Sequence, residues 1–302
     1  MPSLVPLVMP CHSRCPYGTE NGTEKGVAFE VTTSTDKCVP RKSLPYPWSP
    51  AQNVSDRWVF VITPTARKKN RTTQFADLTR LSQTLGWTSR LHWILVEDAH
   101  ERTAFIGRLL ARSRVSEYTH LVYPQQIISG RKWTGRGMDQ RNFALTLLRR
   151  KFSGEDNSGH VVYFLDDDNT VDVRIFEYIR SVEHVGVWPV GLVGGALVET
   201  PKVKDGRVVG WNVSWAPKLR KFQTDMAGFA ISLRLALHFA SASFHNRCHG
   251  FVTFEACFLR SLRVCVSDLE PKTFDLRPRE ILVWHTRSTG TGNRGGNKGF
   301  DV

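Results

Sequence analysis

Three consecutive aspartates, Asp166, Asp167 and Asp168, directly follow the apolar run Val-Val-Tyr-Phe-Leu at positions 161–165. Carboxylates at the carboxyl end of a buried strand face the crevice where open α/β sheets bind ligands. Adjacent carboxylates repel one another unless basic groups or a cation compensate them, and a divalent cation that also binds phosphate oxygens is a natural compensation. A solvated acidic turn that caps a helix is the alternative. The position after a buried strand in a basic chain favours the ligand site.

Other charged residues stand where a strand or a turn ends. His285 and Arg287 follow the apolar run Ile-Leu-Val and are two residues apart, so on an extended segment they project to the same side and could bind a diphosphate or an acidic sugar. Asp98 follows another apolar run, where α/β folds place an acid that contacts a nucleoside. Arg136 and Arg141 flank a turn into a helix and are either phosphate ligands or solvated charges.

Glu255 is an acid in the otherwise apolar stretch Phe-Val-Thr-Phe-Glu-Ala-Cys-Phe-Leu at positions 251–259. A carboxylate there is either desolvated, which raises its pKa and suits it to accept a proton, or it lies on the outer face of a helix and points to water. The sequence leaves both alternatives open.

The composition is that of a folded protein with a basic surface. Of 302 residues, 41% are hydrophobic and 23% are charged, which excludes a disordered chain, a collagen and a coiled coil. The net charge of +13 predicts a positive field that attracts phosphates, sulfated or uronic glycans, or nucleic acid. The sequence has no stacking platform or basic helix typical of a nucleic-acid-binding module, so we expect no nucleic-acid partner.

Apolar runs of strand character alternate with segments of helical periodicity in the first half of the chain. This alternation predicts an α/β fold with a mostly parallel sheet covered on both faces. Beyond position 168, shorter apolar segments punctuated by glycine are typical of antiparallel or mixed strands. We expect strands at 57–63, where Pro64 ends the run, 91–98, 119–124 and 161–165, and helices at 73–85, 102–114 and 138–152.

The chain shows no obvious membrane or zinc-binding segment. No stretch approaches the roughly 20 apolar residues of a membrane helix, and the first ten residues lack the basic start of a signal peptide. We therefore expect neither an anchor nor a targeting signal in this chain. The six cysteines have no metal-site spacing, so a structural zinc is not expected, and their disulfide pairing stays open: Cys11, Cys15, Cys38, Cys248, Cys257 and Cys265.

Ten sequence blocks between Arg57 and Ser288 resemble, in unbroken order, the β-1,3-glucuronosyltransferase family. The blocks are Val61-Ile-Thr-Pro-Thr, Arg80-Leu-Ser-Gln-Thr-Leu, Arg90-Leu-His-Trp-Ile-Leu-Val-Glu-Asp-Ala, Gly135-Arg-Gly-Met-Asp-Gln-Arg-Asn, Val162-Tyr-Phe-Leu-Asp-Asp-Asp-Asn-Thr, Val187-Trp-Pro-Val-Gly-Leu-Val-Gly-Gly, Asp205-Gly-Arg-Val-Val-Gly, Asp225-Met-Ala-Gly-Phe-Ala, Asp268-Leu-Glu-Pro-Lys and Ile281-Leu-Val-Trp-His-Thr-Arg. So many ordered matches make the resemblance highly specific.

The resemblance implies a GT-A glycosyltransferase fold with a Rossmann-like nucleotide-binding half and a mixed-sheet acceptor-binding half. It also implies a homodimer in the Golgi lumen. The implied reaction is Mn²⁺-dependent, inverting transfer of glucuronic acid from UDP-glucuronate to the 3-hydroxyl of a terminal galactose on a proteoglycan or glycoprotein. On this basis we divide the chain into a flexible stem-like segment (1–56), a UDP-sugar-binding subdomain (57–168) and an acceptor-binding subdomain with a C-terminal tail (169–302).

The family's functional residues map onto matching positions of this sequence. Asp168 matches the acid that binds Mn²⁺, and Glu255 matches the catalytic base. The residues that match donor contacts are Pro64, Asp98, Arg136, Arg141, Asp166, Asp167, His285 and Arg287. The residues that match acceptor contacts are Glu199, Trp215, Arg220 and Asp225.

The chain departs from the family pattern at several points. Ala66 stands where the family has a tyrosine that stacks on uracil, and the apolar setting of Glu255 differs from the family's block around its base. The tail beyond Ser288 is short and rich in glycine. A non-catalytic relative that binds glycans or heparin is the alternative function, and turnover of UDP-glucuronate with a galactose acceptor separates the two.

Overall fold

A computed structural model describes residues 38–44, 53–66, 73–124, 137–154, 159–214, 221–245, 253–286 and 288. All of them belong to one unit, Cys38–Val302.

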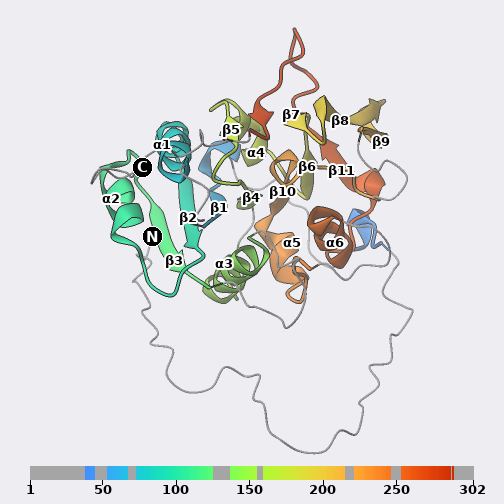
Figure 1. Ribbon diagram of the computed structural model, residues 1–302. Coiled ribbons are helices and arrows are strands. Elements are labelled where there is room, and N and C mark those ends of the chain that lie inside the picture. The colour runs from blue at the N-terminus through green and yellow to red at the C-terminus, as the bar shows by residue number, and fades with distance from the viewer. Residues whose placement is uncertain are drawn as a thin grey trace, which may run out of the picture. The chain divides into compact units, whose positions relative to one another are not determined.

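The larger sheet has the order β11-β6-β10-β4-β1-β2-β3 and the smaller one the order β5-β12-β7-β8-β9 (Figure 1). The strands of the larger sheet are β1 (Val59–Thr65), β2 (Leu91–Glu97), β3 (Tyr118–Val122), β4 (Val161–Phe164), β6 (Val185–Val187), β10 (Phe229–Ser232) and β11 (Leu269–Pro271). Those of the smaller sheet are β5 (Thr170–Val171), β7 (Val190–Val193), β8 (Ala196–Lys204), β9 (Arg207–Asn212) and β12 (Val283–Trp284).

The first four strands pair in parallel, as the alternation of strands and helices predicted. β1 pairs with β2 on one side and β4 on the other, and β3 lies beyond β2. Helices α1 (Gln74–Leu85), α2 (Ala104–Arg112) and α3 (Met138–Lys151) follow β1, β2 and β3 in the sequence. β10 is antiparallel to both β4 and β6, so the sheet becomes mixed beyond β4. The α/β class is confirmed.

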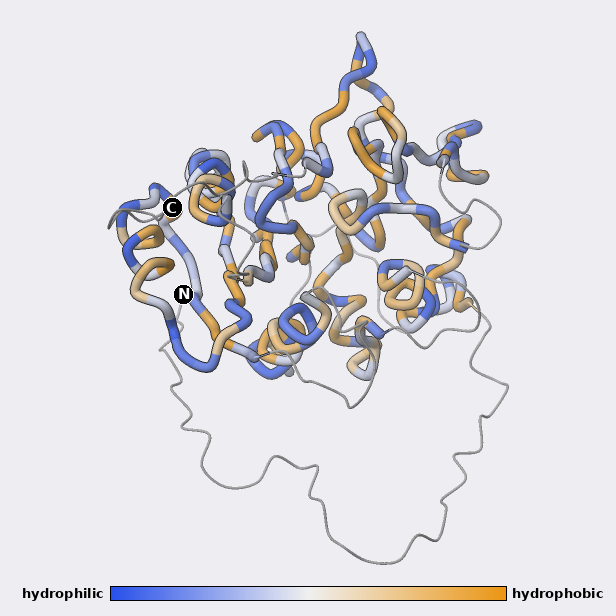
Figure 2. The backbone as a smooth tube through the Cα atoms, in the orientation of Figure 1, coloured by the Kyte–Doolittle hydropathy of each residue, from blue (hydrophilic) through white to orange (hydrophobic). Residues whose placement is uncertain are grey.

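Two hydrophobic clusters cover the two faces of the larger sheet. Alternate side chains of β1 point to opposite faces, so Phe60 and Ile62 join one cluster and Val59 and Val61 join the other. Helices α3, α5 (Leu233–His238) and α6 (Phe254–Ser261) pack on the first face. Helices α1, α2 and α4 (Ile175–Arg180) pack on the second. Figure 2 shows hydrophobic and hydrophilic residues alternating along these helices, because each has one face on the sheet and one toward solvent.

Strand β1 is longer than the sequence predicted. We expected Pro64 to end it, but the strand continues through Pro64, opposite Val96, to Thr65, opposite Glu97. The chain stays extended there because both neighbouring residues are paired with β2. This extension carries the hydroxyl of Thr65 to the edge of the sheet where the acid triplet begins.

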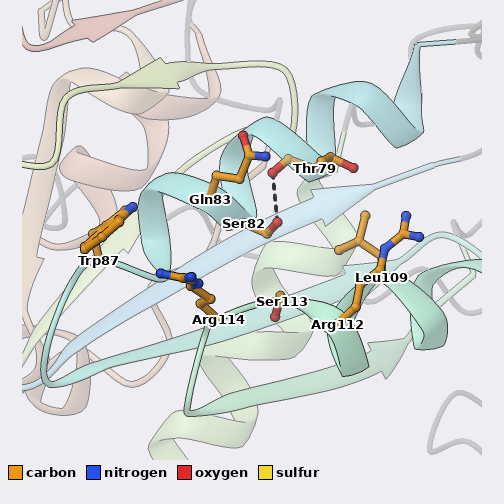
Figure 3. A pocket seen from close by; sticks show the side chains of 8 residues that line it. All are labelled: Thr79, Ser82, Gln83, Trp87, Leu109, Arg112, Ser113 and Arg114. Atoms are coloured by element: carbon orange, nitrogen blue, oxygen red, sulfur yellow. Dashed lines mark hydrogen bonds between the residues drawn. The ribbon is translucent and has the colours of Figure 1, made fainter.

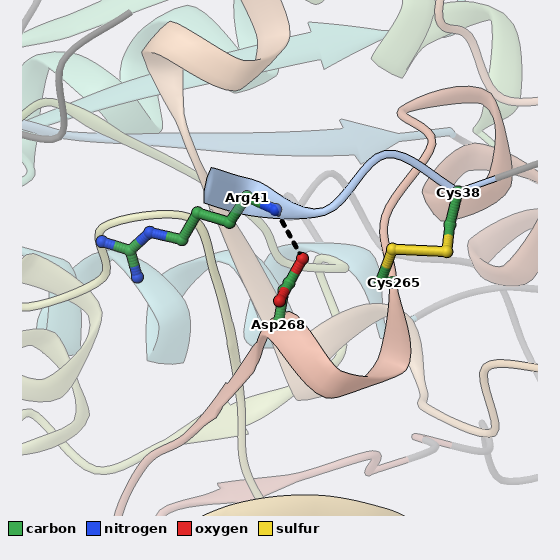
Figure 4. Close-up of a disulfide and its surroundings, with 4 residues drawn as sticks. All are labelled: Cys38, Arg41, Cys265 and Asp268. Carbon is green, nitrogen blue, oxygen red and sulfur yellow. Dashed lines mark hydrogen bonds between the residues drawn. A yellow bond between two sulfur atoms is a disulfide. The ribbon is translucent and has the colours of Figure 1, made fainter. Parts of the chain in front are cut away.

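Residues 38–44, which we assigned to the stem-like segment, are fastened to the folded unit. Cys38 forms a disulfide with Cys265, and the backbone N–H of Arg41 donates to Asp268 Oδ2 at 2.7 Å (Figure 4). The N–H of Val39 donates to the carbonyl of Arg263 at 2.9 Å. Cys257 is disulfide-bonded as well. The division at position 168 stays a prediction, and the larger sheet takes strands from both sides of it.

Among the helices that the structure describes, none has both the length and the apolar character needed to cross a membrane.

Candidate active site

The acid triplet lies just beyond the end of β4, at the edge of the larger sheet where β1 and β2 also end. Because Ile62 pairs with both Ile94 and Phe164, the carboxyl ends of these three parallel strands meet. Asp167 is buried, whereas Asp166 and Asp168 are partly exposed. The triplet therefore lies where open α/β sheets bind ligands.

Protein groups hold the carboxylates of Asp166 and Asp167. Asp166 forms an ion pair with Arg141, a buried side chain one turn into α3. Asp167 Oδ2 accepts a hydrogen bond from Thr65 Oγ1 at 2.6 Å, and Thr65 Oγ1 accepts one from Gln74 Nε2 at 2.8 Å. These contacts compensate the repulsion within the triplet and fix its orientation relative to β1 and α1.

The backbone of Asp168 is anchored by two residues that sequence reasoning missed. Its carbonyl oxygen accepts hydrogen bonds from the guanidinium of Arg80 at 2.8 Å and from Thr286 Oγ1. Arg80 lies on α1 and Thr286 follows β12, so two segments that are far apart in the sequence hold this residue. Thr286 lies between His285 and Arg287, two predicted site residues, and this position in the sequence could have identified it as a site residue.

A glycine lets α3 approach the end of β1. Gly137 has φ +76° and precedes α3, and a Cβ there would lie 2.6 Å from Pro64 Cγ. A larger residue would be strained by this φ and would collide with the proline. Gly137 thus brings the first turn of α3, and with it Arg141, against Pro64 and the acid triplet.

Asp98 lies at the same edge, beside the end of β1. Its backbone N–H donates to the carbonyl of Thr65 at 2.8 Å. The neighbouring Glu97 is buried, contacts His120 Nε2 at 3.0 Å and accepts from the N–H of Thr103 at 3.1 Å. Burial raises the pKa of Glu97, but the hydrogen bonds to His120 and Thr103 outweigh it and lower the pKa overall. A charged Glu97 therefore fixes the loop that carries Asp98.

His285 and Asp225 form an ion pair that joins distant parts of the sequence. His285 Nδ1 lies 3.1 Å from Asp225 Oδ2, and the N–H of His285 donates to the carbonyl of Gly191 at 2.9 Å. Asp225 Oδ1 accepts from the N–H of Ala227 at 3.0 Å, as the N-cap of a 3₁₀ turn. The Asp225 carboxylate raises the pKa of His285 to about 9, so the imidazole is protonated at neutral pH.

Glu255 lies in the first turn of α6, which Thr253 caps by accepting from the N–H of Ala256 at 3.4 Å. The residue retains some exposed surface. Desolvation, followed by the nearby charge of Asp225, raises the pKa of Glu255, while Arg141 acts in the opposite direction. Of the two alternatives that the sequence left open, the structure favours the desolvated carboxylate.

Glu199 is buried on β8 of the smaller sheet, opposite Val190 of β7. The next residue of β7, Gly191, is the one that binds the backbone of His285. Glu199 therefore belongs to the sheet whose strand β12 directly precedes His285. The remaining predicted site residues lie outside the described part of the chain: Arg136, Trp215, Arg220 and Arg287.

The described residues contain no group of three His, Cys, Asp or Glu side chains that could hold a metal ion by themselves. A cation bound at Asp168 would need oxygen atoms from a ligand to complete its shell, as happens where one or two carboxylates share a divalent cation with phosphates. The arrangement has cationic groups for an anionic ligand, Arg141 and His285, and a carboxylate of raised pKa, Glu255, that can accept a proton.

Comparison with known proteins identifies relatives over most of the chain. The family model described as glycosyltransferase family 43 matches residues 81–289. Galactosylgalactosylxylosylprotein 3-beta-glucuronosyltransferase 2 of Mus musculus is 41% identical over 230 residues, which cover 76% of this chain and 68% of that protein. Galactosylgalactosylxylosylprotein 3-beta-glucuronosyltransferase 3 of Homo sapiens is 42% identical over 301 residues, which cover 95% of this chain and 86% of that protein.

Among solved structures, S. aureus TarS 1-349 in complex with UDP-GlcNAc aligns with a TM-score of 0.42 at 14% sequence identity. The alignment covers 78% of this chain and 60% of that chain.

Proposed function

Because the chain belongs to glycosyltransferase family 43, we propose that it transfers glucuronic acid from UDP-glucuronate to the 3-hydroxyl of a terminal galactose, with inversion at the anomeric carbon. One observation supports this proposal: the charges of Asp225 and Arg141 both act on the pKa of Glu255. Asp225 is ion-paired with His285, and Arg141 is ion-paired with Asp166. A proton acceptor and the groups for an anionic donor thus belong to one cluster.

Glu255 is the base of the proposed reaction. As the acceptor hydroxyl attacks the anomeric carbon, a carboxylate oxygen of Glu255 takes the hydroxyl proton. A raised pKa brings this group closer to the working pH, where a general base is most effective. Attack on the face opposite the leaving diphosphate inverts the configuration in a single displacement.

The protonated imidazole of His285 and the guanidinium of Arg141 attract the anionic donor. Asp225 keeps the proton on His285, so a positive charge is in place before the negative charge on the leaving phosphate grows. Such preorganised charge lowers the barrier because it costs no reorganisation during the reaction. We propose that Asp98, beside the end of β1, contacts the uracil, as the family resemblance implies.

Asp168 is the residue that we propose to hold Mn²⁺. Carboxylate oxygens suit this ion, and the residue is partly exposed while Arg80 and Thr286 fix its backbone. Bound Mn²⁺ would act as a Lewis acid that neutralises the diphosphate leaving group. Asp166 and Asp167, which are engaged by Arg141 and Thr65, support the nucleotide.

The acceptor side of the site comprises Glu199 and Asp225 in the described part of the chain. The names of the relatives indicate that those proteins act on a galactosyl-galactosyl-xylosyl-protein, and we propose the same class of acceptor here. By the same resemblance we propose a homodimer that works in the Golgi lumen.

A donor and acceptor screen tests the proposal. Purified protein is incubated with UDP-glucuronate, UDP-glucose or UDP-GlcNAc and a galactosyl-galactosyl-xylose acceptor, with Mn²⁺ or with a chelator. We expect transfer from UDP-glucuronate alone, and only with Mn²⁺. Binding of sulfated glycans without any transfer would overturn the enzyme proposal and favour the non-catalytic relative.

A further inference from the structure

A pocket lies between α1 and α2, away from the acid triplet. Its volume is about 620 Å³, within the range of small-ligand sites. The lining residues come from the second half of α1, the end of α2 and the turns that follow them: Thr79, Ser82, Gln83, Trp87, Leu109, Arg112, Ser113 and Arg114. The start of α1 lies near the acid triplet, because Gln74 binds Thr65. The pocket is therefore toward the opposite edge of the parallel strands.

The lining combines an aromatic face, two cations and several small polar groups (Figure 3). Trp87 is 72% exposed, which is unusual for the largest apolar side chain. Arg112 and Arg114 are exposed, and no carboxylate lines the pocket. Ser82 Oγ donates to the carbonyl of Thr79 at 2.8 Å, so its oxygen lone pairs remain able to accept.

The charged and aromatic groups are held in place by their neighbours. The guanidinium of Arg114 lies 5.6 Å from the ring centroid of Trp87, and that of Arg112 lies 4.5 Å from the ring of Phe75. Gly86 permits this arrangement, since a Cβ there would lie 2.8 Å from the Cβ of Arg114. Cation–π contacts and this close approach preorganise the lining before a ligand arrives.

We propose that this pocket is a binding site for an acidic oligosaccharide that carries uronate or sulfate groups. The apolar face of a sugar ring packs on the indole of Trp87, and its carboxylate or sulfate pairs with Arg112 and Arg114, whose planar guanidinium groups match such anions. The hydroxyl and amide groups of Ser82 and Gln83 bind sugar hydroxyls. This site is separate from the proposed catalytic centre and does not rest on the proposed function.

The position of the pocket favours a ligand that presents neutral hydroxyl donors beside its anionic groups. It lies by the carboxyl-terminal ends of α1 and α2, where the helix dipole and the last carbonyl oxygens are negative. Phosphates are bound at helix amino termini, where N–H groups point at the ligand. Sugar hydroxyls can donate to these carbonyl oxygens, whereas an ionised phosphate, carboxylate or sulfate cannot, so the anionic group of the ligand must lie against the guanidinium groups of Arg112 and Arg114 instead.

Isothermal titration with a non-sulfated chondroitin hexasaccharide tests the site, in the presence of saturating UDP and Mn²⁺ so that the donor site is filled. The variants are Trp87→Ala and the double variant Arg112→Gln/Arg114→Gln. The matched control is Arg207→Gln/Arg279→Gln, which removes two positive charges at exposed positions outside the pocket. We expect roughly tenfold or greater loss of affinity in both pocket variants and less than about twofold in the control.

The affinities of the variants, of a neutral ligand and of the wild type decide the outcome. Equal loss in the control and the pocket variants would overturn the site in favour of diffuse charge attraction, as would equal binding of the neutral cellohexaose by wild type. Undetectable binding of the hexasaccharide by wild type, or its displacement by further UDP, would also overturn it. Transfer to a short acceptor should be unchanged in Trp87→Ala, so failure of this site and failure of the proposed function are distinguishable. Circular dichroism melts confirm that the variants fold.

Discussion

The two sheets hold their functional groups in different ways. In the larger sheet, Asp98 follows β2 directly and the acid triplet follows β4 after one residue, so parallel pairing brings them to one edge. In the smaller sheet, His285 follows the two-residue strand β12, and its partner Asp225 caps a 3₁₀ turn outside that sheet. Regular strand pairing fixes the first group, whereas the second depends on a long-range ion pair together with backbone hydrogen bonds of each partner.

This difference has an electrostatic consequence. In the larger sheet, Asp166 and Asp167 are compensated by Arg141 and Thr65. In the second region, Asp225 raises the pKa values of both His285 and Glu255. We infer that substitutions in the acid triplet weaken binding of the donor, whereas substitution of Asp225 shifts the pH range in which the reaction proceeds.

The largest effect is expected at the larger sheet, from Asp168→Ala. Loss of this carboxylate should abolish transfer and the metal-dependent part of UDP binding, because it removes the proposed ligand of Mn²⁺. The fold should remain intact, since the backbone contacts of Asp168 to Arg80 and Thr286 do not use its side chain. Isothermal titration of UDP with and without Mn²⁺ measures this effect. An unchanged metal dependence would refute the assignment, and Asp56→Ala, at an exposed position, is the control.

Glu255→Gln should lower kcat by about 10²- to 10⁴-fold, the usual contribution of a positioned base. Glutamine preserves the shape of the side chain but cannot take the acceptor proton. UDP affinity should stay nearly the same, which separates this variant from Asp168→Ala. If the variant kept more than about a tenth of the wild-type rate, the base would have to be another residue.

Asp225→Asn tests the coupling between His285 and Glu255. Without the carboxylate, the pKa of His285 should fall from about 9 toward its ordinary 6.5, and the raised pKa of Glu255 should also fall. His285 would then lose its proton near pH 7, so the alkaline limb of the pH profile of kcat/KM moves to lower pH. At pH 8 the protonated fraction, and with it the rate, should drop up to about thirtyfold.

Removal of the same carboxylate should also move the acid limb to lower pH, because Glu255 then stays ionised further into the acid range. The whole bell-shaped profile is expected to shift together. A uniform loss of rate at every pH would show that Asp225 acts only as an acceptor contact, and His285→Gln supplies the comparison profile without the imidazole.

The smallest effect is expected from Ala66→Tyr, at the end of β1. Ala66 is partly exposed directly after this strand, and a tyrosine there would add a ring that can stack on uracil. Stacking on an aromatic contributes about 1–3 kcal/mol per base, so UDP should bind roughly tenfold more tightly. Unchanged or weaker binding, measured by titration, would mean that another side chain such as Arg67 or Arg71 already occupies the platform.

Most elements of the first half were predictable, because apolar periodicity is a local property. The expected helix at 73–85 is α1 (Gln74–Leu85), and the expected strand at 91–98 is β2 (Leu91–Glu97). The strand before Pro64 was predicted too short, since pairing with β2 continues past the proline. The α/β class, with parallel strands that continue into a mixed sheet, is confirmed, and the GT-A assignment stays a prediction.

The contacts of the second half could not be predicted in the same way. Nothing in the segment around Asp225 indicates that it meets His285, and the cysteine spacing left open that Cys38 pairs with Cys265, 227 residues away. Such pairs depend on where whole elements pack, and no local pattern encodes that placement.

The sequence by itself determined the α/β class, the family and the position of the acid triplet after a buried strand, because each depends on residues that are neighbours in the chain. Only the tertiary structure favoured one alternative for Glu255, since the charge of Asp225, 30 residues earlier in the chain, contributes with desolvation to its raised pKa. The tertiary structure alone brought Trp87, Arg112 and Arg114 to one pocket. These residues lie at or just after the ends of α1 and α2, and they line one pocket only because the two helices end side by side.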